Sequence, residues 1–304
     1  MWGYGQCLDT IKGIVMELNS LFSMLIELLT NDSLLQSATN TVPDLVSAAR
    51  VNCGTIKSSP DLVSAIKATS LTLCVMFFLI DFFTKTLHFQ WVTWENVMML
   101  FLKMVVAKVC VDNSEFFTTV IYNGFNSFVN EISSTITQYS FIDTSDWQVA
   151  AQYFVSSSQA SQIINNTDAG FLNFQPLILN MQISIQGLIM KIIMIIANVV
   201  VIARLFELTV YTMIAPVPLS TFACDGLSDI GKGFLKSYAA VTLQSIVLAI
   251  MFIAYAAVNN ALIAGRIGSY NLALDGIMGL ITTLTLGIGV MSSGAWAKRI
   301  VGSS

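Results

Sequence analysis

Five stretches of about 20 residues, all rich in apolar side chains, constrain this chain more than any other feature. They run at residues 62–83, 91–111, 178–203, 237–263 and 277–296. A helix needs ~20 mainly apolar residues to cross a bilayer. Only 11% of the chain is charged, against roughly 25% in an ordinary soluble domain. The sequence therefore predicts an all-α, polytopic membrane helical bundle with about five transmembrane helices.

The N-terminal region, residues 1–61, is not apolar enough to contribute a further transmembrane helix. Within it, apolar residues from Leu8 to Leu29 recur every three or four positions, which predicts an amphipathic helix. This helix can form a coiled-coil seam, lie on the membrane or pack against the rest of the chain. Residues 31–60 are polar and predict a loop with one short helix near 44–50. The region lacks a basic signal-peptide start, so we expect the mature protein to begin near Met1.

Residues 112–177 form an acidic segment that separates a transmembrane hairpin, residues 62–111, from the C-terminal transmembrane cluster, residues 178–304. The segment contains six acidic and no basic residues. Positive charge is enriched in cytoplasmic loops, so we expect a long extracytoplasmic loop. Its apolar residues recur at helical spacing, from Phe116 to Ile132, which predicts helical structure within it. Loops this long can be translocated whatever their charge, and the shorter loops must decide the orientation.

The stretch 205–223 is apolar but contains Pro216 and Pro218. Proline removes a backbone donor and disfavours a continuous helix, so we predict a re-entrant or interfacial segment. Five spans then place the N-terminus outside and the C-terminus in the cytoplasm. Six basic residues lie on the inner side and three near the outer ends of spans, which favours this orientation. The inner set is Lys85, Arg204, Lys232, Lys236, Lys298 and Arg299, and the outer set is Arg50, Lys57 and Arg266.

An enzymatic active site is not evident. His88 is the only histidine, and no acid or cysteine lies near it at metal-ligand spacing. Gly226 to Gly233 matches a nucleotide-binding loop up to Lys232, but glycine follows where Ser or Thr must hold magnesium. A net charge of -4 argues against tight, direct nucleic-acid binding. We expect no enzyme activity, no metal and no cofactor.

Charges inside the spans cost ~2.5–3.5 kcal/mol each at a helix centre. Lys191 is the deepest, and it can line a water-filled path, form an interhelix ion pair or extend its side chain toward the headgroups. Asp81 and Lys103, near the inner ends of the hairpin, can pair.

Small residues predict close helix packing at Ala257, Ala261 and Gly265, which share one helix face. The pattern does not distinguish packing within one chain from packing between copies. The five cysteines are scattered; Cys7 and Cys53 can form an outer disulfide, or all five can act as small packing residues.

The stretch from Arg204 through Gln244 resembles the signature region of the TrbL family, polytopic inner-membrane subunits of conjugative type IV secretion systems. The likeness rests on Arg204 and Glu207 on one helix, the turn around Pro216 and Pro218, and a helix that begins near Lys236 and carries Gln244. The whole-chain layout is also similar to the topology attributed to that family.

This resemblance implies a homo-oligomeric subunit of a channel that moves DNA–protein complexes between bacterial cells. Its partners would be the lipid bilayer, other secretion subunits, a separate ATPase and, transiently, the translocated substrate. Arg204 and Glu207 can pair one helical turn apart, and the proline turn would be a hinge or assembly site first and pore lining second. Two alternatives stay open, namely a solute transporter or ion channel, and a purely structural anchor for a secretion complex. Transporters usually show repeated halves, and this chain shows none.

Overall fold

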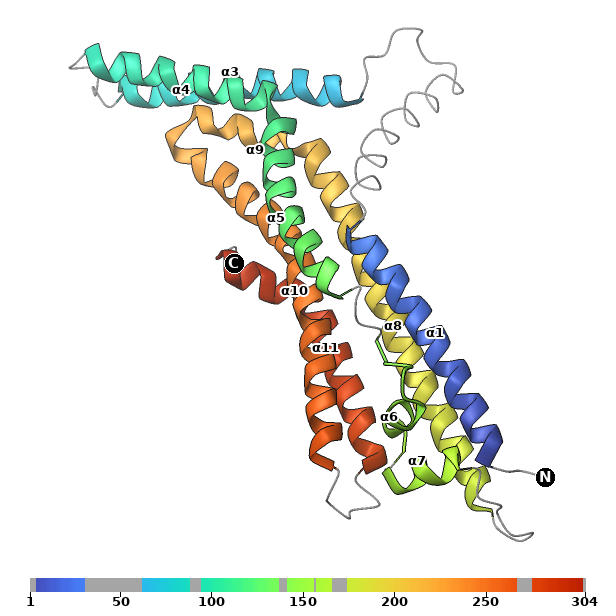
Figure 1. Ribbon diagram of the computed structural model, residues 1–304. Helices are drawn as coiled ribbons and strands as arrows, with labels where there is room; N and C mark the ends of the chain where they lie inside the picture. The colour runs from blue at the N-terminus through green and yellow to red at the C-terminus, as the bar shows by residue number, and fades with distance from the viewer. Residues whose placement is uncertain are drawn as a thin grey trace, which may run out of the picture. The chain divides into compact units, whose positions relative to one another are not determined.

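The computed structural model describes residues 4–30, 62–87, 94–136, 141–155, 157–165, 174–266 and 275–302 (Figure 1). Every secondary-structure element in these ranges is a helix, as predicted. The predicted loop at 31–60, its short helix, Cys53 and His88 lie outside the described residues. The elements are α1 (Tyr4–Thr30), α3 (Leu62–Leu87), α4 (Trp94–Asp112), α5 (Ser114–Ile136), α6 (Trp147–Gln152), α7 (Ser157–Ile164), α8 (Gln175–Ile214), α9 (Pro216–Leu219), η1 (Ser220–Ala223), η2 (Asp225–Leu227), α10 (Ser228–Arg266) and α11 (Asp275–Val301).

Four of the described helices are long and apolar enough to cross a membrane, namely α3, α8, α10 and α11. The chain thus has the fold of a polytopic all-α membrane protein. The predicted second span corresponds to α4, which is not among the four. Its 19 residues include Glu95, Lys103, Lys108 and Asp112, and these charges lower its mean hydropathy.

The predicted third span ends too early. We expected the helix to stop at Ala203, before Arg204, but α8 continues without a break to Ile214 and has 40 residues. At 1.5 Å per residue it is ~60 Å long, about twice the ~30 Å hydrocarbon core of a bilayer.

The chain divides into two compact units. Unit 1 holds the described parts of Met1–Thr30, Phe128–Ala203 and Ser245–Ser293, and unit 2 holds those of Asn31–Ser127, Arg204–Gln244 and Gly294–Ser304. Each unit combines segments that are far apart in the sequence.

In unit 1, α1 lies beside the first part of α8, in the same direction (Figure 1). The Cys7 thiol donates to the Pro176 carbonyl at 3.3 Å, and farther along Asn198 donates to the Leu21 carbonyl at 3.3 Å. The apolar stripe of α1 is buried, from Ile11 to Leu29. Of the three possibilities for this helix, the structure shows packing against the rest of the chain. Cys7 is a free, buried thiol, so it acts as a packing residue.

The acidic segment contributes a folded layer to unit 1. Asn19 of α1 exchanges two hydrogen bonds with the backbone of Ile142, each 3.1 Å. The ring of Phe141 stacks on Tyr255 of α10, with centroids 5.2 Å apart. Burial raises the pKa of Tyr153 to about 12, and the backbone carbonyl of this residue accepts from Gln186 of α8. The prediction of helical structure here is confirmed by α5, α6 and α7.

In unit 2, α3 and α4 lie side by side as an antiparallel hairpin (Figure 1). Both helices pack against α9 and η1, which belong to the proline-containing stretch. This contact defines the candidate site.

Candidate functional site

The proline turn, residues 215–227, reverses the chain between α8 and α10. A proline at 216 or 218 has no N–H for the carbonyl four residues earlier, that of Thr212 or Ile214. The helix α8 therefore ends at Ile214, and the short helix α9 begins at Pro216, where a missing N–H costs little. The predicted break of the helix is confirmed. The first half of the predicted re-entrant or interfacial segment, residues 205–214, belongs to α8.

Side chains within the turn form hydrogen bonds with its own backbone and with the start of α10. Ser220 donates to the Val217 carbonyl at 2.6 Å, and Thr221 donates to the Pro218 carbonyl at 2.7 Å. The Thr221 hydroxyl also accepts from the Gly231 N–H at 3.1 Å. These bonds hold the turn against the start of α10, so it is a defined structural element.

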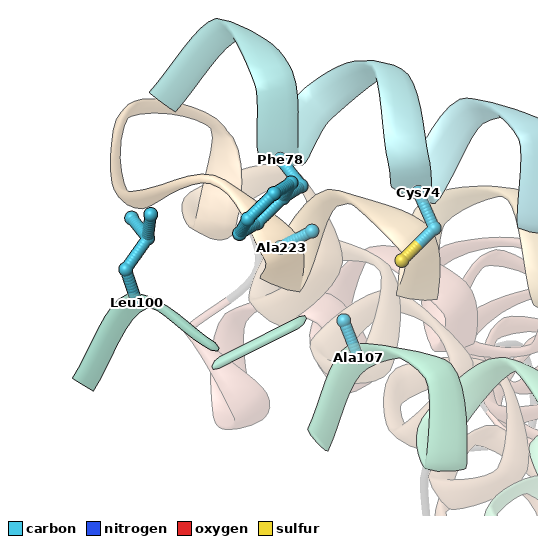
Figure 2. Close-up of a cluster of buried hydrophobic side chains, with 5 residues drawn as sticks. All are labelled: Cys74, Phe78, Leu100, Ala107 and Ala223. Carbon is cyan, nitrogen blue, oxygen red and sulfur yellow. The ribbon is translucent and has the colours of Figure 1, made fainter. Parts of the chain in front are cut away.

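The α3–α4 hairpin packs against this turn through a hydrophobic cluster (Figure 2). Figure 2 shows Cys74 and Phe78 of α3 projecting toward Ala223 of η1, with Leu100 and Ala107 on α4. All five side chains are buried. Because Ala223 is small, the two helices of the hairpin can approach the backbone of the turn closely.

A chain of four charges borders the same cluster. Lys85 Nζ lies 2.9 Å from Asp81 Oδ2 and 2.7 Å from Asp225 Oδ2, and Lys103 Nζ lies 2.6 Å from Asp225 Oδ1. Asp81 and Lys103 thus share one network, although they are linked through Lys85 and Asp225 rather than paired directly. Two carboxylates and two ammonium groups balance to zero net charge, which lowers the cost of placing them among apolar helices.

Arg204 is buried, with 7% of its surface exposed. Its Nε donates to the Val241 carbonyl of α10 at 3.1 Å, beside a buried cluster that includes Leu208 and Tyr238. Glu207 is half-buried and accepts a hydrogen bond from Tyr211. The predicted Arg204–Glu207 ion pair is therefore not found among the described residues. Instead, Arg204 ties the end of α8 to α10.

Lys191 lies in unit 1, away from the residues of the turn in sequence. It forms an ion pair with Glu17 of α1. Of the three possibilities for Lys191, the structure shows the interhelix ion pair, with 29% of the lysine side chain exposed.

The remaining predicted residues lie on α10. Lys236 is exposed near the start of the helix, and Gln244 is half-buried. A Cβ atom on Gly294 of α11 would lie 3.5 Å from Gln244 Nε2, so α11 passes close to this amide. Ala257 and Ala261 are exposed in the single chain, and the surroundings of Gly265 lie outside the described side chains.

The loop that partly matches a nucleotide-binding motif has a structural role at Gly231. The Gly231 N–H donates to the Thr221 hydroxyl. A Cβ atom on Gly231 would lie 3.0 Å from the Pro218 carbonyl oxygen and 3.0 Å from the Phe222 ring. Glycine at 231 thus allows α10 to start beneath the turn. Among the described residues, no group of three or more His, Cys, Asp or Glu side chains is placed to hold a metal ion.

Sequence reasoning missed Asp225 as the bridge of the charged network. It is separated by 140 residues from Lys85 and by 122 from Lys103, and no local pattern marks such a partner. The one available signal was that two lysines in apolar helices, Lys85 and Lys103, required acidic partners beyond Asp81.

Comparison with known proteins finds no family model, no curated protein and no solved structure that matches this chain.

Proposed function

We propose that this chain is a membrane channel or scaffold subunit of a type IV secretion machine that transfers DNA–protein complexes between bacteria. It has no catalytic role and needs no cofactor in this proposal. Energy comes from a separate ATPase, and the chain works as a homo-oligomer beside other secretion subunits. It resides in the bacterial inner membrane.

The observation that carries the proposal is the role of the stretch from Arg204 through Gln244. This stretch bears the likeness to the TrbL family, and it forms the turn on which the α3–α4 hairpin packs. The hydrogen bond of Arg204 and the ion pairs of Asp225 fix its two sides. A well-held turn of this kind suits an assembly site between membrane helices.

The contact between α1 and Ile142 supports five spans in this proposal. Because Asn19 of α1 and Ile142 exchange hydrogen bonds, the two segments lie on one side of the membrane. The chain between them then crosses an even number of times. If α3 is one crossing, α4 supplies the second, and the ion pair of Lys103 with Asp225 offsets part of the cost of its charge.

With α8, α10 and α11 added, the N-terminus and residues 112–177 lie on one side of the membrane and the C-terminus lies on the other. The proposal puts the C-terminus in the cytoplasm. Lys85, Lys232, Lys236 and Lys298 are then on the cytoplasmic side, as the enrichment of positive charge in cytoplasmic loops favours. The exposed face with Ala257 and Ala261 is available for contact with a second copy.

The proposal is tested by deleting the gene from donor cells and measuring conjugative transfer to recipients. We expect transfer to fall to background and to return when the intact chain is supplied. Unchanged transfer in the deletion strain would contradict the proposed function.

A second experiment separates the channel from the structural anchor. DNA in mating cells is crosslinked to a photoreactive amino acid at Thr144, an exposed position in the acidic segment. Lys108, an exposed residue of α4, is the control site. A transfer-dependent crosslink at Thr144 supports a conduit. Dependence of transfer on the chain without any crosslink would favour the anchor.

A further inference from the structure

Unit 2 contains a pocket of about 460 Å³ that plays no part in the proline turn. Its lining comes from the first turns of α10 and from the end of α11, and comprises Asp229, Lys232, Gly233, Lys236, Ser237, Lys298 and Gly302. Positions 229, 232, 233, 236 and 237 recur at the spacing of one helix face. The pocket thus lies between the start of one helix and the end of another, and both helices are apolar enough to span a membrane.

The charge of this pocket is positive. Three lysines and one aspartate give its lining a net charge of +2. Asp229 offsets little of it, because its ion pair with Lys232 is 3.1 Å long and the two side chains are 90% and 61% exposed. Lys236 has no carboxylate within ion-pair distance among the described residues. The start of α10 adds the positive end of its helix dipole.

The pocket has open space next to its two lining glycines. A Cβ atom on Gly233 or on Gly302 would meet nothing within 4 Å. The volume lies within the ~300–1,000 Å³ of small-molecule sites, so the hollow has room for a phosphate-bearing group between the lysines.

Apolar side chains on the same helix turns indicate where such a phosphate comes from. Ile230 of α10, and Trp296 and Ile300 of α11, are exposed by 55%, 44% and 68%. Tryptophan is enriched at the level of lipid headgroups, and basic pockets at the ends of spanning helices bind anionic headgroups. A free phosphate ion has no apolar part to contact these side chains, whereas the acyl chains of a phospholipid can cover them.

We propose that this pocket binds the phosphate headgroup of an anionic phospholipid, held by Lys232, Lys236 and Lys298. This inference does not depend on the proposed role in secretion. The bound lipid would join the start of α10 to the end of α11.

The test uses the full chain purified in detergent and measures its unfolding temperature against added lipid. Phosphatidylglycerol should raise the unfolding temperature in a saturable way, because a ligand of the folded state stabilises it. Phosphatidylcholine with the same acyl chains should not. Equal stabilisation by both lipids would overturn the proposal, and equal stabilisation by inorganic phosphate would overturn the assignment to a lipid.

Variants locate the effect. The triple variant Lys232→Gln, Lys236→Gln, Lys298→Gln should bind phosphatidylglycerol on the order of 100-fold more weakly, from about fivefold for each lysine near an anionic headgroup. The matched control is Arg299→Gln, which removes a charge from the same turn of α11 but not from the pocket lining; its loss should be about fivefold or less. Equal losses in both variants would overturn the site. If the triple variant does not fold, Lys236→Gln alone should weaken binding about fivefold while Lys108→Gln does not.

Discussion

At the scale of single residues, Asp225 is the carboxylate on which the charged network of the hairpin depends. It accepts from Lys85 and from Lys103 at 2.6–2.8 Å, whereas Lys85 also reaches Asp81. Loss of Asp225 would therefore leave Lys103 without its acidic partner, while Lys85 would keep one. The network joins α3, α4 and η2 at one point.

The variant Asp225→Asn should destabilise the protein. Breaking a fully buried ion pair costs about 3–5 kcal/mol, but Asp225 is 52% exposed, so we expect about 1–2 kcal/mol. The measurement is a thermal unfolding curve in detergent. Asp229→Asn is the control, since its pair with Lys232 is exposed and should change stability by less than about 1 kcal/mol. Equal effects of the two variants would show that the network adds nothing.

Gly231 tests the packing of the turn in the same way. In Gly231→Ala, the added Cβ meets the Pro218 carbonyl oxygen and the Phe222 ring at 3.0 Å, and overpacking of this kind costs about 1–3 kcal/mol. We expect a lower unfolding temperature. Gly233→Ala is the matched control, because nothing lies within 4 Å there and alanine favours a helix by about 0.5–1 kcal/mol. A stable Gly231→Ala protein would refute the close approach.

At the scale of elements, the two prolines decide where α8 ends. Restored N–H groups at 216 and 218 would let the helix continue past Ile214 and draw η1 away from the α3–α4 hairpin. This element is central to the proposed role in secretion, so its geometry and the proposed function can be tested together.

The double variant Pro216→Ala, Pro218→Ala should insert into the membrane at normal levels but support conjugative transfer at least about tenfold less well, because η1 would no longer fit between the helices of the hairpin. Pro176→Ala is the control, since this proline lies at the start of α8, where an N–H has no helical partner. Transfer and membrane level are measured in the same cells. Normal transfer by the double variant would dismiss the turn as a functional element.

The elements also show what the sequence can predict. The spans α3, α8, α10 and α11 were predictable, because length and apolar composition are local properties. The break at Pro216 was predictable for the same reason. The continuation of α8 through Arg204 was not, because a basic residue at the end of an apolar run normally marks the membrane surface. Here Arg204 is buried against Val241 and Tyr238. Both of these residues belong to α10, so the burial of Arg204 depends on tertiary packing.

The residues of the candidate site also differ in whether the sequence alone can identify them. Pro216 and Pro218 could be identified from backbone chemistry alone. Glu17 as the partner of Lys191 and Asp225 as the partner of Lys103 could not, because each pair joins segments more than 100 residues apart. Such pairs follow from tertiary placement rather than from spacing.

At the scale of the whole molecule, the proposed function depends on the topology of the chain in the membrane. In the proposed arrangement α3 and α4 both cross the membrane, residues 112–177 lie outside and the C-terminus lies in the cytoplasm. If α3 crosses the membrane and α4 does not, α1 and residue 142 lie on opposite sides, although Asn19 donates to the Ile142 carbonyl. The number of crossings before residue 142 therefore decides whether the proposed topology holds.

Labelling of single cysteines with a membrane-impermeant maleimide tests the proposed topology. Gln6→Cys, Thr144→Cys and Ser304→Cys are placed one at a time in a chain whose five native cysteines are replaced by alanine. On intact protoplasts, we expect Gln6→Cys and Thr144→Cys to be labelled, and Ser304→Cys only after permeabilisation. Labelling of Ser304→Cys on intact protoplasts, or protection of Thr144→Cys, would contradict this topology.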